Sequence, residues 1–175
     1  MTSTETLTGE RADLLEALNK QRFFLRYTVK DLTEEQIRQR STVSELTLGA
    51  LIKHVAQVER QWANFIVEGP SAIGNFADFT PEQLEAWAAA FQVADDVTLA
   101  DLLAEYEGVA KRTDELVASL PDLGADHPLP EAPWFQPNTR WSARRVLLHI
   151  IAETSQHAGH ADIIRESLDG ARTMG

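Results

Sequence analysis

The segment VLLHIIAETSQHAGHADII, residues Val146–Ile164, has the apolar periodicity of a long helix. It contains no proline and shows no alternation of apolar and polar residues with a period of two. At about 100° per residue, five apolar side chains here and just beyond fall within an arc of roughly 60°. They are Val146, Ile150, Ala161, Ile164 and Leu168. We therefore predict a helix with one side facing a protein core.

Outward from this segment, the same periodicity recurs in three more long stretches of the chain. The four predicted helices run from about Leu7 to Tyr27, from Thr47 to Glu68, from Thr98 to Pro121 and from Ser142 to Leu168. Helix-breaking residues gather in the connections, from Gly69 to Pro81 and from Pro121 to Pro137, and a short helix is predicted from Thr80 to Phe91. No segment alternates as a strand would, so the predicted class is all-α, a four-helix bundle with long connections.

The length and composition of the chain predict one domain over residues 1–175, because 175 residues with 43% hydrophobic content suit a single core. The formal charge of -11 repels phosphate backbones and anionic membrane surfaces, so neither nucleic acid nor a membrane is an expected partner. The segment Met1–Glu10 is polar and acidic, unlike a signal peptide, and a cytoplasmic protein is expected. The chain has no cysteine, so any thiol chemistry needs a thiol from outside.

Two groups that can bind a metal ion lie inside the apolar arc of the predicted last helix. Glu153 and His157 are spaced i, i+4, which places their Cβ atoms roughly 5–6 Å apart on one side of the helix. An unpaired carboxylate on a core-facing side is costly, and a buried imidazole also needs partners. His54, the only histidine of the second helix, can point inward and supply a third ligand. Three protein ligands leave coordination positions open, as in catalytic zinc sites.

The same histidines and carboxylate allow other interpretations. Glu153 and His157 could form a hydrogen-bonded pair with no ion between them. His149 and His160 flank the arc, and either could be an outer hydrogen-bond donor, a substrate contact or a solvated residue. His160 is the candidate catalytic residue, and its i, i+3 spacing from His157 would also let it replace Glu153 as a ligand. His127, in a proline-rich loop, is predicted to be structurally neutral.

These residues resemble the ligand pattern of the DinB-like superfamily of metal-binding four-helix bundles, and the resemblance covers nearly the whole chain. In that family a histidine of the second helix joins two ligands of the last helix, often within a string similar to His-x-x-x-His-x-x-x-His-x-Gly. Here the string runs from His149 to Gly159 with Glu153 in place of the middle histidine, and His54 matches the ligand of the second helix. The carboxylate variant is similar to that of mycothiol-dependent maleylpyruvate isomerases. The segment His157–Glu166 resembles an actinobacterial, mycothiol-transferase-like subgroup.

The resemblance implies a metal-dependent S-transferase that activates a low-molecular-weight thiol, expected to be mycothiol, toward a small electrophile. The electrophile would lie between the mouth of the bundle and the loop Trp134–Trp141, whose aromatic residues could line a pocket or only anchor the loop. Zinc is the expected divalent metal, with nickel, iron and manganese as alternatives. A metal-dependent hydrolase and a non-catalytic, metal-binding stress-response protein stay open as alternative functions, and a homodimer stays open as an assembly.

Overall fold

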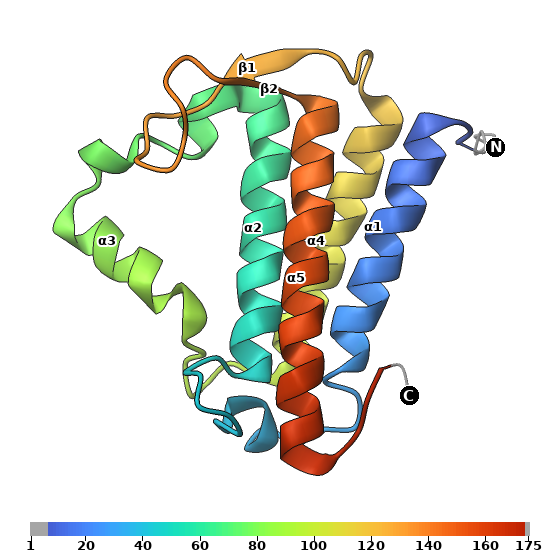
Figure 1. The fold of residues 1–175 in the computed structure, drawn as a ribbon, viewed down its shortest axis with the longest axis vertical. Coiled ribbons are helices and arrows are strands. Elements are labelled where there is room, and N and C mark those ends of the chain that lie inside the picture. The colour runs from blue at the N-terminus through green and yellow to red at the C-terminus, as the bar shows by residue number, and fades with distance from the viewer. Residues whose placement is uncertain (1–6, 174–175) are drawn as a thin grey trace.

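The computed structural model describes residues 7–173, in which four long helices pack side by side (Figure 1). The long helices are α1 (Glu10–Tyr27), α2 (Leu48–Glu68), α4 (Leu99–Ser119) and α5 (Ala143–Asp169). The shorter elements are the helix α3 (Pro81–Ala88), the 3-10 helices η1 (Gln36–Arg38), η2 (Gly69–Ala72), η3 (Phe76–Asp78) and η4 (Ala89–Phe91), and the strands β1 (Asp126–Pro128) and β2 (Arg140–Ser142). The predicted all-α bundle with long connections is confirmed.

Residues 1–6 and 174–175 of the predicted domain lie outside the described residues, as does most of the amino-terminal segment used to predict localisation. Along the part of the chain that is described, none of the helices has both the length and the apolar composition of a membrane span.

Several ends of the long helices lie at capping residues that are visible in the sequence. The hydroxyl of Ser142 accepts a hydrogen bond from the backbone N–H of Arg145 at 3.2 Å, which starts α5. Gly170 adopts the left-handed conformation that ends it. Thr98 caps α4 in the same way as Ser142 caps α5. These ends lie close to their predicted positions, whereas α1 begins at Glu10, later than predicted.

The buried side of α5 differs in phase from the predicted arc. Its buried residues are Ala143, Val146, Leu147, Ile150, Thr154, Ala158, Ala161 and Ile164. Glu153 and His157 lie at the edge of this stripe, with 29% and 12% of their side chains exposed. Their predicted place inside the core-facing arc is corrected, because α5 packs against both α1 and α2 and buries Thr154 and Ala158 between them. Phe23 of α1, a large apolar residue, is 60% exposed.

A buried network of ion pairs crosses the middle of the bundle. The guanidinium of Arg22 in α1 donates to the carboxylate of Glu59 in α2, with 3.1 Å between Nε and Oε2, and both side chains are fully buried. The same guanidinium donates to Asp114 in α4 at 2.8 Å. Buried charges persist only when they are paired, so these contacts fix the register of three helices against one another.

The connection between α4 and α5 contains a short antiparallel sheet that was not predicted. Strand β1 pairs with β2, with His127 opposite Trp141. The Nε2 atom of His127 lies 3.2 Å from the carbonyl oxygen of Ile66, and its ring packs edge-on against Phe65 of α2. His127 is therefore not structurally neutral, because it attaches this connection to the end of α2.

Candidate metal centre

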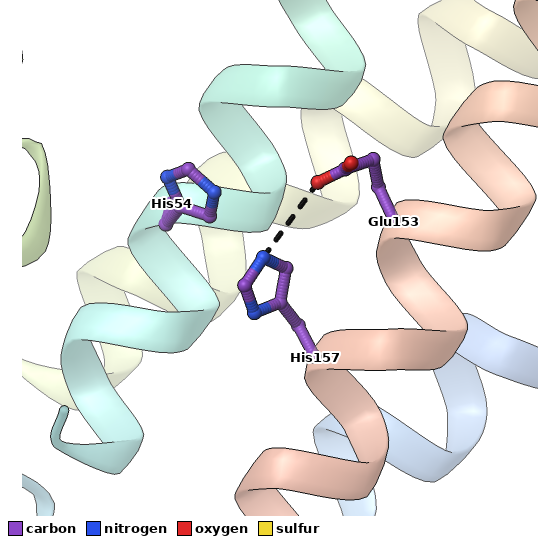
Figure 2. Close-up of side chains that lie close together, drawn as sticks. All are labelled: His54, Glu153 and His157. Carbon is purple, nitrogen blue, oxygen red and sulfur yellow. Dashed lines mark ion pairs between the residues drawn. The ribbon is translucent and has the colours of Figure 1, made fainter. Parts of the chain in front are cut away.

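His54, Glu153 and His157 lie together between α2 and α5, as Figure 2 shows. Each offers one donor atom, and the three donor atoms all lie within 4.8 Å of one another. Nε2 of His157 is 3.6 Å from Oε2 of Glu153, and the centroids of the two imidazole rings are 4.8 Å apart. Donors that bind one ion at about 2.0–2.2 Å lie at most about 4.4 Å apart, so binding would need only small side-chain rotations.

Two elements hold His54 in place beside the α5 residues. The helix α2 leaves its side chain half-buried, with its ring centroid 4.8 Å from that of His157 on α5. On its other side the ring stacks on Phe91 of η4, with 4.1 Å between centroids. The Nζ atom of Lys53 donates to the backbone carbonyl of Gln92 at 2.7 Å, which ties the segment after α3 to α2. Phe91 thereby restricts rotation of the His54 ring, a role that was not predicted.

The surroundings favour the protonation states that bind metals. Burial is the main cause that lowers the pKa of His54 to about 4, and the charge of His157 is the second. This imidazole is therefore neutral at pH 7. The neighbouring His157 lowers the pKa of Glu153 more than burial raises it, so the carboxylate is ionised. Neutral imidazole and ionised carboxylate are the ligand forms of these side chains. A pair of nitrogens with one oxygen suits zinc and other transition metals.

His160 and His149 lie on either side of the three clustered donors. The Nδ1 atom of His160 lies 3.4 Å from Nδ1 of His157, on the side of that ring that faces away from Glu153. The Nε2 atom of His149 lies 4.0 Å from Oε1 of Glu153, and burial is the main cause that lowers the pKa of His149. Its ring meets the ring of Trp62 edge-on, with 4.8 Å between centroids. Each flanking histidine therefore contacts one of the clustered residues.

A cavity of about 360 Å³ opens beside the cluster. His54, Glu153 and His149 form its polar wall. The rest of its lining comes from α2 and from the connections after α2 and before α5, and consists of Val58, Gln61, Trp62, Ile73, Gly74, Phe76, Phe79, Pro130, Ala132, Trp134 and Phe135. Two of the three predicted ligands, His54 and Glu153, therefore line a mostly apolar pocket, an arrangement typical of small-molecule sites.

The aromatic residues before α5 divide between the two roles considered for them. Trp134 and Phe135 line the cavity, whereas Trp141 stacks on Trp62 with 4.9 Å between centroids and anchors the connection. The contribution of Phe76 was not predicted. Its signal in the sequence is a large aromatic residue within a connection rich in glycine and proline, where solvent exposure would otherwise be unfavourable.

A comparison with solved structures identifies a similar fold. The chain matches the crystal structure of the conserved protein of locus from Enterococcus faecalis, with a TM-score of 0.65 and 14% sequence identity. The match covers 94% of this chain and 100% of that chain. At this identity the likeness shows the fold alone. No curated protein matches the chain.

A comparison with protein families gives the assignment. The family model described as Mycothiol-S-transferase matches residues 13–170, which include His54, Glu153 and His157. This match spans most of the chain and agrees with the fold and with the resemblance to DinB-like bundles drawn from the sequence, which it confirms. The chain belongs to the mycothiol-S-transferase family.

Proposed function

We propose that this protein is a metal-dependent S-transferase that joins mycothiol to a small electrophile, with His54, Glu153 and His157 holding one divalent ion, expected to be zinc. The observation that carries the proposal is the cluster of three donor atoms within 4.8 Å, two of whose residues, His54 and Glu153, line an apolar cavity. The family match supports the thiol, since the family is described by mycothiol transfer.

The chemistry follows from the residues that the site has and from those that it lacks. The chain has no cysteine, so the sulfur nucleophile comes from the co-substrate. When bound, a divalent cation favours the thiolate form of a thiol at neutral pH. In the transfer, the sulfur lone pair forms the new C–S bond, the bond to the leaving group breaks with its electron pair, and the thiol proton goes to solvent. The apolar cavity holds the electrophile and excludes the water that would compete with the thiolate.

Single substitutions test the ligand set. Protein purified without a nickel column should contain about one ion per chain, and His54→Ala or His157→Ala should remove it, because two remaining ligands hold a divalent ion poorly. Glu153→Gln should weaken binding severely through loss of the charge. Glu166→Gln is the matched control, since Glu166 lies on the same helix and pairs with Arg172 instead. Elemental analysis measures each case, and full occupancy in both histidine variants would place the ion elsewhere.

The thiol requirement tests the reaction. Turnover of a model electrophile should need added thiol, and its rate should rise with pH along a titration displaced below that of the free thiol. Removal of the metal should abolish the displacement. Mycothiol should be the best donor, ahead of glutathione and bacillithiol. A rate equal to the metal-free control with every thiol would reject transfer, and thiol-independent turnover would instead establish metal-assisted hydrolysis.

A further inference from the structure

The cavity beside the metal-ligand candidates is walled by aromatic rings from three separate segments. Trp62 comes from α2, Phe76 and Phe79 come from the connection after it, and Trp134 and Phe135 come from the connection before α5. The ring centroids of Phe76 and Trp134 are 5.0 Å apart, and those of Trp134 and Phe135 are 6.1 Å apart. These are favourable separations for edge-to-face contacts, and a planar ligand can join such an array at the same spacing.

The charges around the cavity disfavour an anionic ligand. Among the residues that the structure describes, its lining contains one carboxylate, Glu153, two histidines and no lysine or arginine. The guanidinium of Arg145 lies 4.0 Å from the centroid of Trp141, which does not line the cavity. A divalent ion, the Glu153 carboxylate and one thiolate sum to zero charge, so no net positive charge is left for an anionic electrophile. Burial of an unpaired anion among aromatic rings is strongly unfavourable.

We propose that the acceptor of this enzyme is an uncharged, flat aromatic electrophile bound in this cavity, an inference that rests on the proposed thiol transfer. The volume of about 360 Å³ suits a molecule of one or two fused rings. A larger hollow of about 610 Å³ shares Ile73, Gly74 and Phe79 with the cavity, but it contains none of the three candidate ligands. The acceptor carbon therefore has to lie in the smaller cavity, where His54 and Glu153 form the polar end.

A binding experiment tests the cavity without any turnover. N-phenyl-1-naphthylamine and 8-anilino-1-naphthalenesulfonate share one skeleton and differ by a sulfonate, and each fluoresces when it enters an apolar site. Metal-free wild-type protein, in whose described lining Glu153 is the charged side chain, should bind the neutral probe about tenfold more tightly than the sulfonate, or better. Trp134→Ala should weaken the neutral probe about tenfold. Phe23→Ala is the matched control, because Phe23 is 60% and Trp134 58% exposed but only Trp134 lines the cavity.

Two results of this titration would overturn the inference. One is equal or tighter binding of the sulfonate, and the other is unchanged affinity for the neutral probe in Trp134→Ala. Circular dichroism of each variant checks that the helices are retained, so that a loss of binding reports the cavity and not unfolding.

A turnover experiment separates this inference from the proposed function. With mycothiol as the donor, 1-chloro-2,4-dinitrobenzene should give at least about a tenfold higher kcat/KM than 4-chloro-3,5-dinitrobenzoate, after each is divided by its uncatalysed rate. Preference for the benzoate would reject the acceptor class and leave thiol transfer intact. Tight binding of the neutral probe with no turnover of either compound would reject thiol transfer and leave an aromatic binding site.

Discussion

His160 contacts the candidate ligand His157 at its Nδ1 atom, whereas the Nε2 atom of His157 is the one near Glu153. With 3.4 Å between their Nδ1 atoms, one ring donates and the other accepts. When His157 carries its proton on Nδ1, its Nε2 atom, 3.6 Å from Glu153, has a free lone pair for a metal ion. This tautomer, in which His157 donates from Nδ1 to His160, is the one that can bind metal through Nε2. We therefore expect His160 to orient a ligand and not to coordinate the ion itself.

Removal of the His160 side chain should therefore weaken metal binding without abolishing it. We expect His160→Ala to lower metal affinity by about tenfold to a hundredfold, as loss of an orienting hydrogen bond typically does. Competition with a chromogenic chelator measures the affinity. His127→Ala is the control, because His127 contacts the end of α2 and not the cluster. Complete loss of metal would instead make His160 a ligand, and unchanged affinity would remove its orienting role.

The position of a residue could be predicted when neighbouring residues in the sequence fix it, and not when tertiary contacts do. The proximity of Glu153 and His157 could be predicted because the i, i+4 spacing on a helix fixes it whatever the rest of the chain does. His54 needed one further step, the packing of two amphipathic helices. Phe91 could not be predicted to stack on His54, because the path of its segment is set by tertiary contacts such as that of Lys53 with the carbonyl oxygen of Gln92.

At the level of elements, helix ends were predictable because capping acts through neighbouring residues, as at Ser142 and Thr98. The sheet of β1 and β2 was not predictable, since strands of three residues are too short to show an alternation of apolar and polar residues. The buried side of α5 was displaced from the predicted arc because two partner helices, and not one, decide which side is covered. Thr154 consequently lies in the core, with its hydroxyl donating to the carbonyl oxygen of Ile150 at 2.8 Å.

The contact between the end of α2 and the β1–β2 sheet gives a prediction about Gly69. Its φ of 69° is a conformation rarely adopted by other residues, and a Cβ there would lie 2.8 Å from Nδ1 of His127. Gly69→Ala should lower the free energy of unfolding by about 1–3 kcal/mol from backbone strain, with a further loss from the clash. Denaturant unfolding measures it.

Gly9 is the matched control for this change, because its φ of 63° is similar and no atom lies within 4 Å of a Cβ added there. Gly9→Ala should therefore cost less than Gly69→Ala, and addition of His127→Ala to Gly69→Ala should reduce the difference. Equal losses at Gly9 and Gly69 would show that the packing of His127 against Gly69 does not constrain this junction.

Across the whole molecule, the buried network of Arg22 joins α1 to α2 and α4. Arg22→Met should lower the free energy of unfolding by about 3–5 kcal/mol, because it leaves the carboxylate of Glu59 buried and unpaired. The double change Arg22→Met with Glu59→Leu should recover most of this loss, since a well-packed apolar pair replaces the charges. Urea unfolding followed by circular dichroism measures both variants.

The surface pair of Lys111 and Glu115 gives the comparison for the buried network, with side chains 75% and 65% exposed. Lys111→Met should change the free energy of unfolding by less than about 1 kcal/mol. A similar small change for Arg22→Met would mean that water reaches Glu59 and that the network does not hold the helices in register.

The three candidate ligands lie on the long helices α2 and α5, whereas most of the cavity wall comes from the connections around Phe76 and Trp134. In evolutionary terms, this separation allows the connections, and with them the preference for an acceptor, to change while the helices and the candidate ligands stay the same. Insertions and replacements in exposed connections are tolerated more readily than changes in packed helices. A designer could therefore graft foreign segments in place of residues 73–79 and 130–135 and obtain transferases for new acceptors from one scaffold.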